Sequence, residues 1–243
     1  MLTFSSINPS SIQWNTPLDI SIPLRAAKDN VAAWYVEPPR FEPVVMGDWI
    51  GDVNQGGTVN FRNIFFNPHG HGTHTECVGH ISKEPYTINQ CLKKFMFSCR
   101  LITVSLVNNE IKKDAILAEL KGKELTEALV IRTVPNSADK LSRHYSKTNP
   151  PYFEPAALQW MAENTIEHLL TDLPSVDPEE DGGALLAHKA FWQYPQRTRL
   201  NATITELIYV SDGVKDGLYV LNLQIASFEN DASPSKPVLY AVQ

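Results

Sequence analysis

Residues 100–134, RLITVSLVNNEIKKDAILAELKGKELTEALVIRTV, carry the clearest indication of the fold class. Within them, RLITVSLV (100–107) and EALVIRTV (127–134) are short apolar runs rich in β-branched residues, which predict buried strands. Between the two runs, DAILAEL (114–120) has the apolar spacing of a helix. A strand, a helix and a second strand in this order predict an α/β fold.

The chain on both sides of this unit continues the alternation. Apolar spacing predicts helices over 154–165 and 185–193, and strands over 17–24, 61–68, 166–173, 202–210 and 219–228. The last two strands follow one another without a helix between them, which favours some antiparallel pairing and therefore a mixed sheet. Residues 30–60 are rich in Trp, Pro and Gly with little periodicity, and predict a long functional or interface loop. We expect a single domain over residues 1–243.

Composition excludes several classes of protein. The net charge of -6 disfavours a nucleic-acid partner, because phosphate binding needs a clustered basic face. No run approaches the ~18 apolar residues of a membrane span. The first residues lack a basic flank followed by an apolar stretch, so no signal peptide is expected. Three cysteines form no CxxC pair and are expected to be free thiols in a reducing compartment. These features together predict a cytoplasmic protein.

The residues with chemical potential are concentrated in NPHGHGTHTECVGHI (67–81). Four of the seven histidines of the chain fall within these positions, together with Glu76: His69, His71, His74 and His80. Imidazole and carboxylate are the usual ligands of zinc, manganese and iron. In an extended chain, residues two apart point the same way, so His74 and Glu76 can bind one ion. The alternative is a polar, glycine-rich loop that happens to contain many histidines.

Residues 72–80, GTHTECVGH, resemble the signature of the cyclase family of metal-dependent hydrolases, H-x-G-T-H-x-D-x-P-x-H. His74 and His80 match in place with Gly72 and Thr73, whereas Glu76 replaces Asp and Val78 replaces Pro. In that family the first two histidines and the Asp bind a divalent metal, and the last His serves catalysis. Weaker matches follow in the family's order along the chain: Asp19–Ser21, Leu129–Thr133, Asp172–Asp177 and Leu223–Ser235.

The first histidine of the signature has no direct counterpart, because position 70 is Gly and His69 and His71 lie on either side of it. For His69 to bind the metal, one extra residue must bulge out, which Gly70 tolerates. For His71 to bind, a tight turn must be shortened, which is sterically harder. We therefore favour His69 and keep His71 as the alternative. A third possibility is that neither histidine binds and the metal site is weakened or lost.

His188 and Glu206 stand at positions where the family supplies an active-site His and an acid. In ATITELIYV (202–210), Glu206 shares one strand face with Ile204 and Ile208, so a carboxylate interrupts an apolar stripe. A buried carboxylate is costly unless it is paired, protonated or metal-bound. The alternative is an edge strand on which Glu206 is solvated. For His188 the alternative is a hydrogen-bonded packing histidine on a helix.

The resemblance implies a swivelling β/β/α-type cyclase fold, assembled as a homodimer or higher homo-oligomer. Residues 30–60 would then wall the pocket or reach a neighbouring subunit. The implied activity resembles that of arylformamidases, which hydrolyse small aryl or cyclic amides such as formamides and lactams. The variant signature also leaves open a catalytically quiet family member that only binds a metal or ligand.

The resemblance also implies a role for each residue. A zinc or manganese ion held by His69, His74 and Glu76 would activate water for attack on the amide carbonyl. His80 would act as general acid/base. His188 and Glu206 would position the water or hold a second ion, with Glu76 bridging the two ions.

Overall fold

The computed structural model describes residues 1–243, and most of its strands belong to one sheet. The strands are β1 (Leu18–Asp19), β2 (Arg40–Pro43), β3 (Val45–Met46), β4 (Trp49–Ile50), β5 (Arg62–Phe65), β6 (His74–Glu76), β7 (Met96–Ser105), β8 (Glu110–Ile111), β9 (Ala128–Val134), β10 (Tyr152–Phe153), β11 (His168–Thr171), β12 (Thr203–Glu206), β13 (Gly217–Ile225) and β14 (Ala232–Ala241). The helices are α1 (Ile88–Cys91), α2 (Lys113–Leu120), α3 (Pro155–Glu163) and α4 (Leu186–Trp192). Short 3-10 helices are η1 (Phe4–Ser6), η2 (Pro9–Ser11), η3 (Val53–Gln55), η4 (Val78–His80) and η5 (Ala138–Leu141).

The main sheet closes on itself as a barrel. Its order is β14-β13-β7-β9-β11-β12-β6, and β6 pairs in turn with β14, while β1 lies beside β14 outside the ring. Strands β7, β9, β11 and β12 run parallel, and the other pairs are antiparallel. Closure leaves few unpaired backbone groups at sheet edges, which protects the sheet from pairing with other chains.

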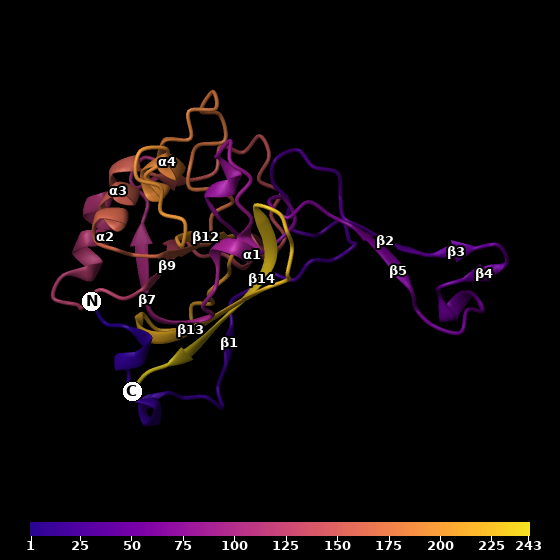
Figure 1. Cartoon of the computed structure of the whole chain (residues 1–243), viewed down its shortest axis with the longest axis horizontal. Coiled ribbons are helices and arrows are strands. Elements are labelled where there is room, and N and C mark those ends of the chain that lie inside the picture. Colours follow the sequence, from indigo (N-terminus) through magenta and orange to yellow (C-terminus); the bar gives the residue numbers. More distant parts are fainter.

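Two apolar layers explain why the central strand β9 begins with four consecutive apolar residues, ALVI. Along β9, Leu129 and Ile131 pack in a cluster with residues of α2, α3 and α4, whereas Ala128 and Val130 belong to a second cluster with residues of β7 and β13. Successive side chains of a strand point to opposite faces, so both faces of β9 are buried. The three helices gather on one side of the barrel (Figure 1).

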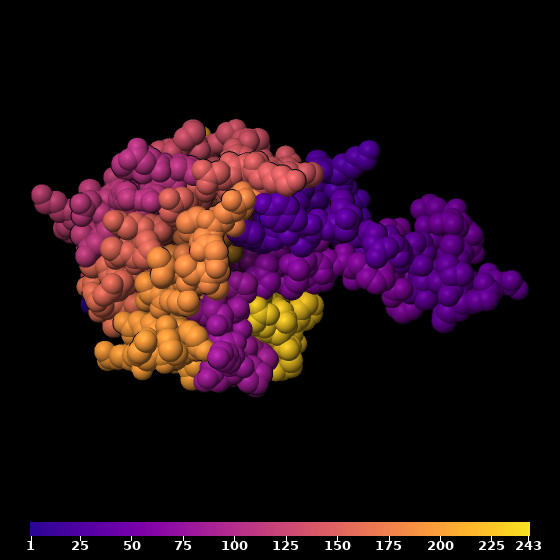
Figure 2. Space-filling model, turned by 90° about the horizontal axis from the view of Figure 1, so that it is seen from above, coloured from indigo at the N-terminus to yellow at the C-terminus, as the bar shows by residue number.

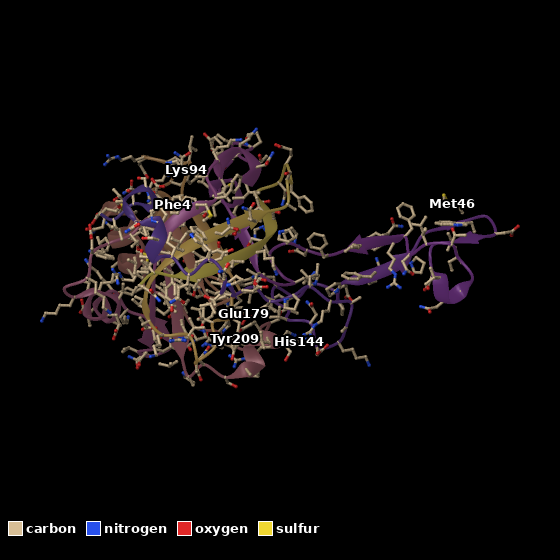
Figure 3. All side chains as sticks on the ribbon, turned by 90° about the horizontal axis from the view of Figure 1, so that it is seen from below. Phe4, Met46, Lys94, His144, Glu179 and Tyr209 are labelled. Carbon is tan, nitrogen blue, oxygen red and sulfur yellow. The ribbon has the colours of Figure 1, made fainter.

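Residues 40–65 form an arm that projects from the barrel (Figures 1 and 2). Strand β2 pairs with β5 along the arm, and β3 pairs with β4 nearer its tip. Met46 lies towards the outer end, far from the body (Figure 3). The prediction of one long loop over 30–60 was therefore wrong for much of its length. The two-stranded pairing depends on partners about twenty residues apart, which local periodicity does not reveal.

The predicted α/β class and mixed sheet are confirmed, and each predicted helix and strand overlaps an observed one. The predicted strand over 61–68 is present as β5, but it pairs within the arm and not with the barrel. Strand β14 was not predicted, and its residues Pro234 and Pro237 are unusual in a strand that is paired on both sides. No helix is long and apolar enough to cross a membrane.

Candidate metal centre

Strand β6 places His74 and Glu76 at the closure point of the barrel. Both side chains are fully buried. In the β6–β12 register His74 lies directly opposite Glu206, and in the β6–β14 register Glu76 lies opposite Ala232. Side chains directly opposite on neighbouring strands are in contact range, and His74 Nε2 is 3.3 Å from Glu206 Oε2. The strand pairing therefore joins residues separated by more than a hundred positions.

His69 reaches the same cluster from the loop before β6. Its Nδ1 is 3.1 Å from Glu76 Oε2, and its ring centre is 5.2 Å from that of His74. Gly70 packs tightly against the chain, because a Cβ there would lie 2.7 Å from Val36 Cγ2 and 3.0 Å from the carbonyl oxygen of Ala33. A histidine at position 70 would not fit this backbone without displacing its neighbours.

His71 points into different surroundings. Its Nδ1 accepts a hydrogen bond of 2.8 Å from the backbone N–H of Asn67, and its Nε2 is buried without a hydrogen-bond partner. It borders a separate small cavity with Ser235 and Lys236, whereas His69 borders the cavity that also contains His80 and His188. Of the two candidates, His69 is the one that joins Glu76.

His188 enters the cluster from α4. Its Nε2 is 3.1 Å from Glu76 Oε1 and 4.0 Å from Glu206 Oε1. Its Nδ1 is 2.6 Å from Asp177 Oδ2, and the same carboxylate accepts the backbone N–H groups of Ala187 and His188. Asp177 therefore orients the ring of His188, and it also accepts two backbone N–H groups in the first turn of α4 that have no partner within the helix. Asp177 ends the Asp172–Asp177 stretch, which the sequence showed only as one of the weaker matches to the family.

Both Glu206 and His188 are buried, with 3% and 2% of their surface exposed. The alternative of a solvated edge carboxylate at position 206 is therefore wrong. Glu206 Oε1 accepts a hydrogen bond of 3.1 Å from the backbone N–H of Val176, which leaves Oε2 directed at His74.

Three histidines of the cluster, His69, His74 and His188, share one arrangement of their ring nitrogens. Each has one nitrogen at hydrogen-bond distance from an acceptor outside the cluster: the Gly72 carbonyl for His74, Asp177 for His188, and Asp231 for His69. That nitrogen must carry the proton. The other nitrogen of each ring faces a carboxylate oxygen of Glu76 or Glu206. The lone pairs of an unprotonated imidazole nitrogen and a carboxylate oxygen repel one another at this distance. Each of the three nitrogen–oxygen pairs is therefore stabilised by a proton between the two atoms or by a cation.

The electrostatics of the cluster follow from this arrangement. Burial alone would lower the pKa of His69, but the nearby carboxylates of Asp231 and Glu76 outweigh it and raise that pKa to about 10. The pKa of His188 is raised to about 10 in the same way by Asp177 and Glu76. Burial opposes the charge on Glu76, yet the nearby His80 and His188 hold its pKa well below the usual range. The cluster therefore has the charge complementarity of a cation site.

The donor set fits a divalent ion. His74 Nε2 and Glu76 Oε2 are buried and have no hydrogen-bond partner, and such atoms are costly unless something binds them. The ligand atoms of His69, His74 and Glu76 lie within 4.8 Å of one another, as do those of Glu76, His80 and His188. A histidine that binds a metal through one ring nitrogen usually donates the N–H of its other ring nitrogen to a carboxylate or a carbonyl. His69, His74 and His188 each have such an acceptor.

His80 lies at the open side of the cluster, and its side chain is 31% exposed. Its Nδ1 is 3.2 Å from Asp231 Oδ2, and its ring centre is 4.3 Å from that of His69. Asp231 was assigned no role from the sequence, although it begins the DASP stretch of the tail that resembles the family. Its proximity depends on β14, the strand that periodicity did not predict.

A cavity of about 380 Å³ opens onto this cluster. His69, His80, His188 and Glu206 line its inner end. Trp34, Val36 and Leu185 line its walls, and Glu179 and Asp181 stand beside them. Trp34 and Leu185 both have left-handed backbone conformations, with φ of 61° and 48°. Such conformations are strained for residues other than glycine and cluster at functional sites.

A buried histidine–carboxylate cluster at the closure point of an α/β barrel defines a protein with a candidate divalent-metal site. Residues 18–178 match the model of the cyclase family, described as "Putative cyclase", and the chain belongs to that family.

Among curated proteins, the chain is similar to kynurenine formamidases. That of Bacillus cereus is 25% identical over 224 residues, which cover 91% of this chain and 96% of the relative. That of Bordetella petrii is 25% identical over 217 residues, covering 85% of this chain and 96% of the relative.

Solved structures show the same fold. One, described as a potential metal-dependent hydrolase with cyclase activity, superposes with a TM-score of 0.67 at 18% identity, covering 94% of this chain and 98% of the other. An isatin hydrolase bound to the product analogue thioisatinate superposes with a TM-score of 0.66 at 12% identity, covering 96% and 94%.

Proposed function

We propose that this protein is a metal-dependent hydrolase of small amides, resembling arylformamidases. The observation that carries the proposal is the common arrangement of His69, His74 and His188. Each ring donates one N–H outwards and directs its other nitrogen at Glu76 or Glu206. Membership of the cyclase family and the similarity to kynurenine formamidases support the same chemistry.

In this proposal His69, His74 and Glu76 hold a zinc or manganese ion. His188 and Glu206 would either position the reacting water or, together with Glu76, hold a second ion. A bound divalent ion supplies Lewis-acid activation of water and polarises the amide carbonyl.

His80 is the proposed acid/base. Its Nδ1 faces Asp231, so its Nε2 is free to exchange protons with a bound substrate. His80 lines the cavity and remains partly exposed, as a group that exchanges protons with substrate must be. It would take a proton at Nε2 from the attacking water and return it to the leaving nitrogen.

The cavity walls favour an apolar or aryl amide. Trp34, Val36 and Leu185 offer apolar surface, and no lysine or arginine lines the cavity. A carboxylate on the substrate would therefore find no cationic side chain there and would face Glu179 and Asp181. We accordingly expect neutral formanilides and lactams such as isatin to be better substrates than amides that carry a net negative charge.

We further propose that the arm over residues 40–65 contacts a second copy of the chain in a homodimer or larger homo-oligomer. Val45, Met46, Phe61 and Ile64 on the arm are each more than half exposed. Exposed apolar side chains gathered on one projecting segment are characteristic of interaction surfaces. A two-stranded ribbon is also marginally stable in water without a partner.

Elemental analysis and turnover together test the proposed function. Protein purified without chelator should contain at least one zinc or manganese ion per chain, and should hydrolyse formanilide, isatin or N-formylkynurenine. Removal of the metal should abolish hydrolysis, and adding it back should restore it. Stoichiometric metal without hydrolysis of any of the three compounds would favour the catalytically quiet family member. Absence of metal after reconstitution with both ions would contradict the proposal.

A further inference from the structure

A single carboxylate oxygen connects the two histidines that have different proposed roles. Asp231 Oδ2 is 2.8 Å from His69 Nε2 and 3.2 Å from His80 Nδ1. The carboxylate can only accept hydrogen bonds when it is ionised, so both of these ring nitrogens must carry protons.

The backbone fixes Asp231 firmly beside the histidine loop. Its carbonyl oxygen accepts a hydrogen bond of 3.0 Å from the backbone N–H of Cys77. The next residue, Ala232, pairs with Glu76 in the β6–β14 register. Gly79 lets the two segments pack closely, because a Cβ at that position would lie 3.3 Å from Asp231 Cβ and 2.0 Å from the Tyr86 carbonyl oxygen. The carboxylate is therefore placed by sheet pairing and close packing on both sides.

His69 is oriented in the opposite sense to His74 and His188. His74 and His188 direct Nε2 at the carboxylates of the cluster, whereas His69 directs Nδ1 at Glu76. This reversal accompanies the displacement from position 70, where a side chain would collide with Val36 and Ala33. A histidine that binds through Nδ1 needs a hydrogen-bond acceptor at Nε2 to hold its ring and tautomer.

We propose that Asp231 is a positioning residue that lets the displaced His69 serve as a metal ligand through Nδ1 and, with the same oxygen, leaves His80 Nε2 available as the acid/base. The inference rests on the proposed function of the site. It assigns to the C-terminal strand a part in both metal binding and catalysis, and it explains how a chain without a histidine at position 70 keeps a complete ligand set.

NMR of the cadmium-substituted protein tests this without any turnover. In protein labelled with ¹⁵N and loaded with ¹¹³Cd, scalar coupling identifies the ring nitrogen that binds the metal. We expect coupling to Nδ1 of His69 and to Nε2 of His74, with the Nε2 proton of His69 and the Nδ1 proton of His80 retained. Coupling to Nε2 of His69, or none to that residue while His74 is coupled, would overturn the inference.

Variants of Asp231 supply the second measurement. Asp231→Ala should weaken zinc binding roughly tenfold to a hundredfold, the range seen when the partner of a ligating histidine is lost. Asp231→Asn should lose less, because its amide oxygen can take the place of Oδ2 and still accept from the histidines, although without the negative charge. In both variants the tautomers of His69 and His80 should become mixed.

Glu229→Gln is the matched control. Glu229 lies two residues earlier on the same loop, and its carboxylate bonds to Thr87 and Asn89 and not to the histidines. It should bind zinc as the unaltered protein does. Equal zinc affinity in Asp231→Ala and Glu229→Gln, with both proteins folded by circular dichroism, would refute the role of Asp231 while leaving the hydrolase proposal intact. The expected cadmium coupling with no hydrolysis of any amide would support the role of Asp231 and contradict the hydrolase proposal.

Discussion

His74 and Glu206 face one another across neighbouring strands, with Nε2 and Oε2 3.3 Å apart and both side chains buried. The antiparallel register of β6 and β12 produces this pair, although the two residues are 132 positions apart (206 − 74). His74 already donates through Nδ1 to the carbonyl oxygen of Gly72, so its Nε2 has a lone pair that faces the carboxylate. A cation bound by Nε2 and Oε2 would remove the repulsion between these two atoms without a second proton on the ring.

This relationship makes Glu206→Gln an informative substitution. The amide has the same shape, and its oxygen can still accept from the Val176 N–H, so the variant should fold. It removes a buried negative charge beside His74 and His188, and hydrolysis should fall by about 10²- to 10⁴-fold. Steady-state kinetics on formanilide, with circular dichroism to verify folding, is the measurement. Unchanged kcat/KM would mean that the charge at position 206 has no part in the chemistry.

The two histidines that flank Gly70 should differ in their contribution to metal binding. His69→Ala should lower zinc affinity by about tenfold or more, because the ring facing Glu76 is lost. His71→Ala should have a much smaller effect, since His71 bonds to Asn67 and borders the other cavity. Competition titrations with a zinc chelator compare the two variants directly. Equal losses, or a larger loss for His71→Ala, would mean that His71 is the ligand.

His168 should make the fold sensitive to acid independently of the metal centre. Burial lowers its pKa to about 3, and its Nδ1 lies 2.8 Å from Thr203 Oγ1. The unfolded chain therefore takes up a proton at position 168 near pH 6.5, whereas the folded chain does not. The stability is complete above the unfolded pKa and decreases as the pH falls from about 6.5 towards 3, by about 2 kcal/mol between pH 7 and pH 5.

Urea unfolding of His168→Asn at pH 7 and pH 5 checks this expectation. The asparagine cannot take up a proton, so the loss of stability between the two pH values should be about 2 kcal/mol smaller than in the unaltered protein. His144→Asn is the matched control, because it makes the same replacement at an exposed position. An identical pH dependence in all three proteins would show that His168 titrates normally in the folded state.

Shortening the arm should change the oligomeric state. Replacing residues 44–61 by two glycines joins Pro43 to Arg62, which are already paired in the β2–β5 register. The barrel does not depend on the removed residues, so the protein should fold but become monomeric. Size-exclusion chromatography with light scattering gives the mass of both proteins. A monomeric full-length protein, or an oligomer that survives the deletion, would refute the proposed contact.

Local sequence patterns were sufficient to predict the class of the fold and the segment that contains most of the candidate metal site. The largely apolar sequences of β7 and β9 reflect burial on both faces, which is a property of each strand and is visible in its own residues. The grouping of His69, His74 and Glu76 within one loop likewise needs no knowledge of distant residues. The carboxylate within the apolar stripe of β12 also indicated a special role for Glu206.

The neighbours of β6 and the orientation of the histidine rings depend on pairing between distant segments of the chain. Closure of the barrel brings Glu206 and Asp231 to the two sides of β6, and strand register is set by contacts between segments that lie far apart in the sequence. The choice of His69 over His71 depends on the packing of Gly70 against Val36, and ring orientation depends on acceptors such as Asp231 and Asp177. Periodicity shows which face of a strand is buried, but the identity of its neighbours appears only when the chain is folded.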